Sequence, residues 1–388
     1  MGTSSVRPSA AANPLASLQN YGQSVWLDFI RASLITGGEL KRILDEDGLG
    51  GVTSNPAIFA KAIDGSDDYK TSIEEISKDP SIGPKRVYEL LAIKDIQGAA
   101  DILRPVYDRT KAQDGYVSLE VAPDLANNTQ GTLEEARRLW QEVNRPNVMI
   151  KVPATPEGVP AIRALLSEGI NVNVTLLFSK EAYEGVAHAF VDAIEARVNK
   201  GLPVDRVASV ASFFVSRIDS AVDALLEEKA KTGSGADQAR LEGLRGKVAI
   251  ANAKLAYQSY KRLFSGPRWD ALAAKGARLQ RPLWASTSTK NPAYSPTLYV
   301  DELIGPDTVN TLAPASIEAL QRGEGNQRAD TVTEDVDGAR QVMADLKAAG
   351  VDIDDVTDTL EREGVDSFAA SFTDAFGTIE KRRAEVTS

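Results

Sequence analysis

The feature of this sequence that most constrains its fold is a regular alternation of short β-rich runs with longer helical stretches. Eight runs are expected to be strands: Ser24–Phe29, Gly51–Ser54, Tyr116–Val121, Val148–Val152, Val172–Phe178, Val207–Val215, Pro282–Ser286 and Thr308–Leu312. Between them, apolar residues recur at helical spacing, for example in Gly38–Asp47, Pro84–Lys111, Thr132–Val143, Pro156–Ser167 and Ser179–Lys200. Strands that alternate with helices favour parallel βα units, and eight such strands close a (β/α)8 TIM barrel.

The competing architecture is a doubly wound open sheet, but no Gly-x-Gly-x-x-Gly follows the first run, so its dinucleotide-binding version loses support. Additional helices are expected at the N-terminus, after strand six and at the C-terminus. Two or three helices should fill the stretch from Ile218 to about Ala277, with a break at Lys231–Ala236. Helices at Asp337–Ala349 and Phe368–Val386 are expected to cover the barrel wall or one mouth. Residues 1–14 are expected to be a flexible leader, and residues 15–388 a single barrel domain.

Two small counts limit the chemistry that is open to the chain. Its 388 residues include no cysteine and one histidine, His188, which lies in a helical pattern and is expected to be packed or half-exposed. Disulfides, thiolate nucleophiles and cysteine-ligated metals are therefore excluded. Catalysis has to come from Lys, Asp, Glu, Ser, Thr, Tyr and Arg.

The net charge of −11, from 44 Lys plus Arg and 55 Asp plus Glu, disfavours general nucleic-acid binding. An anionic substrate would need a local cluster of cations. The N-terminus lacks the apolar segment of a secretory signal, and no run of about 18 apolar residues occurs in the chain. We therefore expect a cytoplasmic protein with no membrane partner.

Polar side chains occupy several expected strands, although the core of a parallel barrel usually holds branched apolar residues. In the fifth run, Asn171, Asn173 and Thr175 alternate with apolar residues, and alternate residues point to opposite faces. The polar set is therefore expected to point into the barrel near the C-terminal strand ends, where barrel active sites lie. Six side chains would converge there: Asp28, Asn55, Glu120, Lys151, Asn173 and Thr175.

A lysine on a barrel strand has a specific chemical use. Loss of water lowers the pKa of its ammonium, which gives the neutral amine that attacks a carbonyl and forms a Schiff base. The protonated imine then accepts electrons while a neighbouring C–C bond breaks, and two carboxyl groups can move the protons. Lys151, Asp28 and Glu120 fit these roles. The alternative is a buried salt bridge that only fixes the fold.

Six local sequences carry a family resemblance: SVWLDFIRASL, GVTSNPAIF, VSLEVAPDLA, NVMIKVPAT, INVNVTLLFS and SFFVSRID. Taken in order, they resemble the motifs of the transaldolase family, in its longer bacterial branch, from about Ser17 to the C-terminal region. The resemblance implies a class I aldolase-type barrel enzyme of the pentose phosphate pathway that needs no cofactor and no metal. Such an enzyme moves a dihydroxyacetone unit from sedoheptulose 7-phosphate to glyceraldehyde 3-phosphate, giving erythrose 4-phosphate and fructose 6-phosphate.

The resemblance also assigns catalytic roles by position. Lys151 would form the Schiff base with C2 of the ketose, and Asp28 would be the base at the C4 hydroxyl. Glu120, together with Thr175 and a water, would shuttle protons while the imine forms and is released.

The substrate-binding residues follow in the same way. Asn55 and Asn173 would hold the hydroxyls of the dihydroxyacetone moiety, and Ser212 would line the same site. At the phosphate end, the resemblance implies three further residues: Arg217, Ser286 and, less directly, Lys290. The family often has an arginine two residues after the serine, where this chain has Ser288. Lys290 could supply the missing charge or could simply be solvated.

Three other functions stay open at this point. A hydrolytic class I aldolase acting on fructose 6-phosphate would release dihydroxyacetone to water. A catalytically silent barrel would bind sugar phosphates without turnover, and Asp28 with Glu120 could instead be ligands of Mg²⁺. We expect sugar phosphates as the small-molecule partners and a monomer or homodimer as the assembly.

Overall fold

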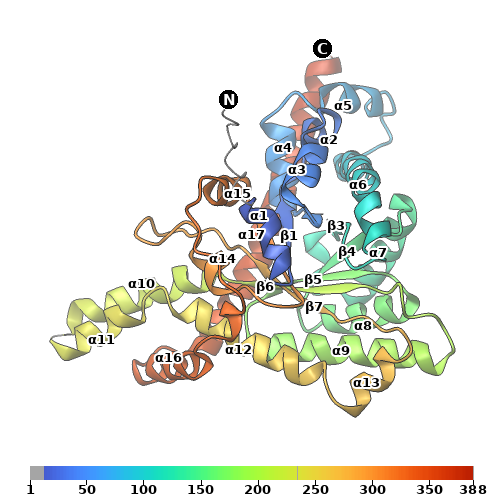
Figure 1. Ribbon diagram of the computed structural model, residues 1–388. Helices are drawn as coiled ribbons and strands as arrows, with labels where there is room; N and C mark the ends of the chain where they lie inside the picture. The colour runs from blue at the N-terminus through green and yellow to red at the C-terminus, as the bar shows by residue number, and fades with distance from the viewer. Residues whose placement is uncertain (1–12, 234, 388) are drawn as a thin grey trace, which may run out of the picture.

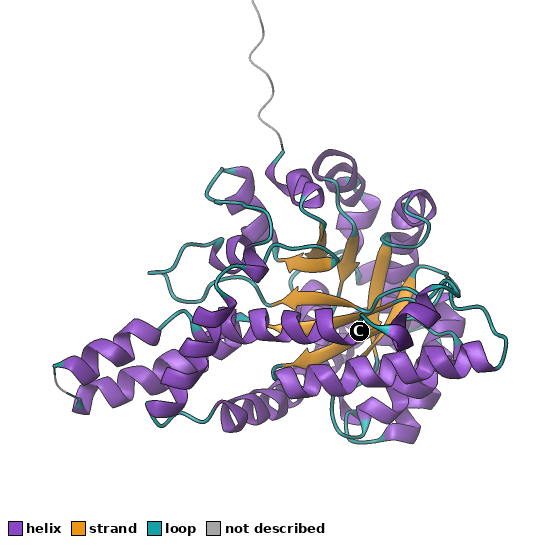
Figure 2. Cartoon of the chain, turned by 60° about the horizontal axis from the view of Figure 1, so that its bottom comes forward, coloured by secondary structure: helices purple, strands orange, loops and turns teal. Residues whose placement is uncertain are grey.

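The computed structural model describes residues 13–233 and 235–387. Eight parallel strands pair in chain order and form a closed barrel, because the last strand pairs with the first. Their bounds are β1 Gln23–Asp28, β2 Gly51–Thr53, β3 Tyr116–Glu120, β4 Val148–Pro153, β5 Val172–Leu177, β6 Ser209–Phe214, β7 Arg281–Ala285 and β8 Thr308–Leu312. The predicted barrel is confirmed and the open sheet is wrong. Figure 2 shows the strands at the centre with helices around them.

Helices follow each strand, and most of them were expected. The first ten are α1 Pro14–Asn20, α2 Ala32–Thr36, α3 Glu39–Asp47, α4 Pro56–Asp64, α5 Lys70–Ile76, α6 Pro84–Arg109, α7 Thr129–Val143, α8 Gly158–Glu168, α9 Lys180–Asn199 and α10 Ser216–Thr232. A short 3-10 helix, η1 Pro123–Leu125, follows β3. The Ser179 side chain caps α9 by accepting a hydrogen bond from the Ala182 amide at 3.0 Å, as such residues do at helix starts.

The remaining helices are α11 Ala236–Leu244, α12 Val248–Leu263, α13 Pro267–Ala273, α14 Leu298–Glu302, α15 Pro314–Gln321, α16 Val336–Ala348 and α17 Ile353–Thr387, with a second 3-10 helix, η2 Thr331–Thr333. The expectation of two or three helices after β6 was wrong, since four are present. Gly246 adopts a positive φ of 70° between α11 and α12, and Pro267 opens α13 directly after Gly266. Helices α10 and α11 project from the barrel (Figure 1).

The two chain ends differ from expectation in their boundaries. The expected leader lies outside the described residues except for Asn13 and Pro14, and these two start α1 rather than continuing a flexible segment. Helix α17 begins at Ile353, well before the expected Phe368, because Gly364 does not interrupt it. This helix packs against α4, α5, α6, α10, η1 and β5, so it covers the C-terminal mouth of the barrel rather than its wall.

The barrel interior is polar near that mouth. The Asn173 amide on β5 donates to Ser118 Oγ on β3 at 3.0 Å, and these two strands are not neighbours in the sheet. Such a bond can form only through the barrel interior, so the polar face of β5 points inward as expected. The apolar residues Val172 and Val174 on its other face are fully buried. No helix of the described residues is long and apolar enough to cross a membrane.

Candidate active site

A cavity of about 150 Å³ lies among the C-terminal ends of the strands, beneath α17. Most of the residues that the sequence singled out line it. They are Asp28, Asn55, Lys151, Thr175, Ser212, Arg217, Ser286 and Lys290. The structure therefore brings together side chains from β1, β4, β5 and β6 and from the segments that follow β2, β6 and β7.

Lys151 lies at the buried end of this cavity. It is paired in register with Glu120 of the neighbouring strand, and its Nζ is 3.3 Å from Glu120 Oε2. The same Nζ donates a hydrogen bond to the Ser54 carbonyl at 3.1 Å. The two charged side chains are only 6% and 5% exposed, so their interaction is weakly screened by solvent.

The buried Glu120 carboxyl has a shifted pKa. Burial raises the pKa of the Glu120 carboxyl, the nearby Asp28 charge raises it further, and Lys151 partly offsets both. A carboxyl with a raised pKa holds a proton more readily than an ordinary glutamate, as suits a general acid–base. On β5, which neighbours β4, the buried Thr175 Oγ1 has no hydrogen-bond partner among the described residues.

Asp28 and Asn55 are both held by local bonds. Thr53 Oγ1 donates to Asp28 Oδ1 at 2.7 Å, which fixes the carboxylate at the cavity wall. Asn55 Oδ1 accepts from the Ile58 amide at 2.9 Å and so caps α4. Its Nδ2 is not used by the cap, and Asn55 can donate from this atom into the cavity.

Asn173 and Ser212 are joined by a hydrogen bond at the cavity wall. Ser212 Oγ donates to Asn173 Oδ1 at 2.6 Å, while Asn173 is fully buried and bonded to Ser118 on its other side. Only Ser212 of this pair lines the cavity. The structure thus places Asn173 next to the site but beneath its wall.

Arg217, in the first turn of α10, and Ser286, which is bonded to the first residue of that helix, both line the cavity. The Ser286 carbonyl accepts from the Ser216 amide at 3.0 Å, and the Ser286 and Ser216 hydroxyls are 2.9 Å apart. Ser286 adopts a positive φ of 55°, which is uncommon for a residue with a side chain. The Arg217 guanidinium lies 5.3 Å from the centre of the Phe214 ring.

The charge of Arg217 is not neutralised by an ion pair among the described residues. Burial lowers the pKa of its guanidinium, and the charges of Asp28 and Glu363 oppose this, but an arginine keeps its proton in proteins. The helix dipole adds positive potential at the same point, because Arg217 is in the first turn of α10.

Ser288 and Lys290 complete this end of the cavity. Ser288 Oγ lies 3.1 Å from Ser316 Oγ, so Ser288 contacts α15. Lys290 is exposed, lines the same cavity and makes no ion pair with a described residue.

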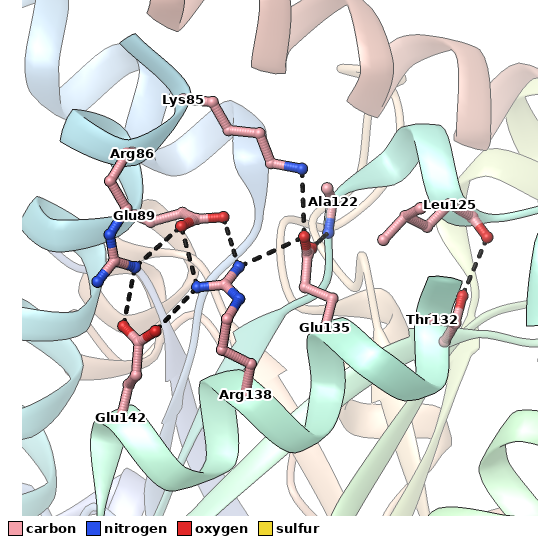
Figure 3. Close-up of polar contacts among 9 residues, drawn as sticks. All are labelled: Lys85, Arg86, Glu89, Ala122, Leu125, Thr132, Glu135, Arg138 and Glu142. Atoms are coloured by element: carbon pink, nitrogen blue, oxygen red, sulfur yellow. Dashed lines mark hydrogen bonds and ion pairs between the residues drawn. The ribbon is translucent and has the colours of Figure 1, made fainter. Parts of the chain in front are cut away.

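Charged residues of α6 and α7 form a network that bonds to the backbone of the segment after Glu120 (Figure 3). Glu135 Oε1 accepts from the Ala122 amide at 2.6 Å, and its other oxygen pairs with Lys85 Nζ at 3.1 Å. Arg138 bridges to Glu89 at 2.7 Å. These contacts fix the chain two residues after Glu120 and so restrict where its carboxyl can point.

Sequence reasoning missed two aromatic residues of the cavity wall, Phe214 and Phe368. Phe368 belongs to α17, which was expected to cover either the wall or one mouth. The spacing of Phe368, Phe372 and Phe376 by four residues marks one apolar helix face and was the available signal.

The positions of the acidic side chains do not support the alternative of a Mg²⁺ site. Within residues 13–233 and 235–387, no three His, Cys, Asp or Glu side chains gather where they could hold a metal ion. Glu120 is already paired with Lys151. His188 is exposed on α9 rather than packed or half-exposed, and it lies outside the cavity lining.

Comparison with known proteins places the chain in one family. The model of the Transaldolase/Fructose-6-phosphate aldolase family matches residues 25–379. A transaldolase of Trichodesmium erythraeum is 48% identical over 97% of this chain and 99% of its own length. Transaldolase 2 of a Nostoc species is 47% identical over 95% and 97% of the two chains, and a transaldolase of Acidothermus cellulolyticus is 46% identical over 95% and 96%. The chain belongs to the transaldolase/fructose-6-phosphate aldolase family.

Proposed function

We propose that this chain is a transaldolase, a transferase of the non-oxidative pentose phosphate pathway, and that Lys151 is its nucleophile. The family includes both transaldolases and fructose-6-phosphate aldolases. The full-length relatives at 46–48% identity are named transaldolases, and this favours transfer to an aldehyde over release to water. The single observation that supports the role of Lys151 is its burial at the cavity floor in contact with Glu120.

The proposed reaction uses four side chains. The Lys151 amine attacks the ketose carbonyl at C2, and Glu120 with Thr175 moves the protons as water leaves and the imine forms. Asp28 then takes the proton from the C4 hydroxyl. The C3–C4 bond breaks, its electrons pass to the imine, and the aldehyde departs. The resulting enamine carbon attacks the acceptor aldehyde, and the same steps run in reverse.

Binding of the sugar uses the polar wall of the cavity. We propose that Asn55 donates to a hydroxyl of the dihydroxyacetone moiety, and that Ser212, oriented by Asn173, contacts the same moiety. The bond between Ser212 and Asn173 supports a shared role rather than two independent contacts.

For the phosphate, we propose Arg217 and Ser286 as the principal contacts and Lys290 as a second cation. The unpaired charge of Arg217, the start of α10 and the bond that ties Ser286 to that helix support this placement. Because Ser288 carries no charge, Lys290 is the remaining cation of the cavity lining after Arg217 and Lys151.

We further propose a cytoplasmic enzyme whose residues 15–388 form one domain, that works as a monomer or homodimer, and that has no nucleic-acid partner. The net charge of −11 supports the last point, because phosphate backbones attract basic surfaces. The additional helices share one hydrophobic core with the barrel, which supports the single domain.

A transfer assay tests the proposed activity. Purified protein is given fructose 6-phosphate with and without erythrose 4-phosphate, and sedoheptulose 7-phosphate and free dihydroxyacetone are measured. A transaldolase forms sedoheptulose 7-phosphate only with the acceptor and releases little dihydroxyacetone without it. Rapid release of dihydroxyacetone in both cases would identify a hydrolytic aldolase, and no turnover with tight binding would identify a silent barrel.

A further inference from the structure

Helix α17 crosses the mouth of the barrel on a stripe of phenylalanines. The rings of Phe372 and Phe376 pack edge-on against Tyr88 of α6, with ring centres 4.9 Å and 6.1 Å apart. The helix also approaches β5 closely, since a Cβ added at Gly364 would lie 2.8 Å from Leu176 Cδ2. These contacts hold α17 at a fixed place above the cavity.

The first ring of this stripe reaches the reactive amine. Phe368 lines the cavity and is only 4% exposed. Its ring centre is 5.9 Å from Lys151 Nζ, within the range of a cation–π contact. The polar contacts of the same Nζ, to Glu120 and the Ser54 carbonyl, leave this side to the apolar ring.

A phenyl ring beside the amine has a different effect from the polar wall, because it offers no proton donor and excludes water. An enamine formed on Lys151 next to this ring would meet an apolar surface without water on that side. Exclusion of water from an active site prevents side reactions of unstable intermediates.

We propose that Phe368 is a specificity-determining residue that shields the enamine on Lys151, so that it reacts with an aldehyde instead of being protonated. This inference rests on the transaldolase function and the imine proposed above. It adds a role for α17, which supplies a residue to a site otherwise built by the barrel strands and the segments that follow them.

Two routes lead away from the enamine, and both balance without a redox partner. In transfer, the enamine carbon forms a C–C bond with the aldehyde carbon, and the aldehyde oxygen takes a proton. In release, the enamine carbon takes a proton from water, and water then adds to the iminium carbon. The C–N bond breaks, which frees dihydroxyacetone and returns the amine of Lys151. Phe368 is expected to slow the first step of release.

The experiment compares Phe368→Ala with Phe372→Ala, a matched control on the same face of α17 that is 7% exposed and does not line the cavity. Each variant is given fructose 6-phosphate with erythrose 4-phosphate, and the ratio of free dihydroxyacetone to transferred units is measured. The ratio is expected to rise about tenfold or more in Phe368→Ala and by less than about twofold in Phe372→Ala. The ratio is informative because general weakening of α17 would affect both variants alike.

An unchanged ratio in Phe368→Ala, or an equal rise in Phe372→Ala, would overturn the proposal. If circular dichroism shows that Phe368→Ala is unfolded, Phe368→Tyr replaces it, because tyrosine keeps the packing of the ring and adds a hydroxyl that can donate a proton, so the ratio is again expected to rise. Reduction of the wild-type mixture with borohydride distinguishes failure of the proposed function from failure of the role of Phe368. Without an adduct on Lys151 the proposed function itself fails, whereas an adduct with an unchanged ratio defeats only the role of Phe368.

Discussion

Lys151 and its direct neighbours decide which carbonyl chemistry the cavity can support. Two carboxyl groups near the amine differ in their surroundings, since Glu120 is buried against the lysine and Asp28 accepts a hydrogen bond from Thr53. Such a difference allows one acid to carry protons at the imine nitrogen while the other acts at a substrate hydroxyl. These contacts support the proposed roles of Glu120 at the imine nitrogen and of Asp28 at the substrate hydroxyl.

Replacement of Glu120 tests that division. Glu120→Gln keeps the shape of the side chain but can no longer carry the proton, so kcat for transfer is expected to fall by about 100-fold or more. Stopped-flow measurement of imine formation with fructose 6-phosphate should show the same loss. The control is Glu135→Gln on α7, which bonds to the Ala122 amide, and its kcat should fall far less. A Glu120→Gln enzyme with nearly normal kcat would refute the proton-carrier role.

Arg217 gives a second prediction, this time for binding. Arg217→Ala removes charge-assisted hydrogen bonds to phosphate, and KM for fructose 6-phosphate is expected to rise by about 10- to 100-fold. Turnover of unphosphorylated fructose should be unaffected, which makes it the internal control. Arg240→Ala, an exposed arginine of α11, should behave as wild type. Equal losses with both sugars would place Arg217 outside the phosphate site.

The sequence anticipated that several of these residues gather at the C-terminal strand ends, because charged and amide groups on barrel strands are rare and therefore conspicuous. It could not show that Asn173 lies beneath Ser212, because depth in a barrel depends on bonds between strands that are not neighbours. It also could not assign Phe368 to the site, since a phenylalanine in an amphipathic helix is ordinarily a core residue. Its place next to Lys151 follows only from the position of α17 in the structure.

Among the elements, α10 connects the phosphate end of the cavity to the helices that follow it. Asp219, two residues after Arg217, accepts hydrogen bonds from the Ala249 amide and from the Tyr299 hydroxyl, each at 2.8 Å. These bonds join α10 to α12 and α14. Burial raises the pKa of Asp219 to about 6, although both hydrogen bonds lower it.

This raised pKa predicts a pH-dependent stability. The native protein holds a proton on Asp219 up to about pH 6, whereas the unfolded chain loses it near pH 4, so stability from this group is lost as pH rises between those values. Asp219→Asn cannot ionise. The free energy of unfolding of Asp219→Asn relative to wild type should therefore increase by up to about 3 kcal/mol from pH 4 to above pH 6.

Urea unfolding at a series of pH values measures this difference. Asp237→Asn, at an exposed position of α11, is the control and should show no such trend. A relative stability of Asp219→Asn that is constant with pH, or that decreases as pH rises, would contradict the expected ionisation of Asp219.

Element boundaries show where sequence patterns stop being informative. The eight strands were predicted because short β-rich runs separated by helices repeat along the whole chain. The start of α17 was placed too late, at Phe368 instead of Ile353, and the approach of Gly364 to Leu176 explains why a residue without a side chain lies inside this helix. The helices after β6 were undercounted, and the turn at Gly246 between α11 and α12 is short.

For the whole molecule, helix α17 covers the mouth of the barrel and lines the cavity there together with the strand ends. The acidic chain presents few cations to a sugar phosphate, and Lys151, Arg217 and Lys290 are those that line the cavity. The absence of cysteine and the exposed position of the single histidine agree with chemistry based on lysine and carboxyl groups.

A lysine mechanism also predicts how the protein responds to chelators. Dialysis against EDTA is expected to leave transfer activity and thermal stability unchanged, because no step of the proposed reaction needs a metal. The readouts are kcat and Tm before and after dialysis, with and without added Mg²⁺. Loss of activity that Mg²⁺ restores would support Asp28 and Glu120 as metal ligands instead.

The proposed mechanism requires that C2 of the substrate becomes covalently attached to Lys151. The most direct measurement is reduction with sodium borohydride in the presence of fructose 6-phosphate, followed by peptide mass spectrometry. The expected result is a reduced dihydroxyacetone adduct on the peptide that contains Lys151, loss of activity in proportion to labelling, and no adduct in Lys151→Arg. An unlabelled Lys151 in a protein that still catalyses transfer, or an adduct on another lysine, would contradict it.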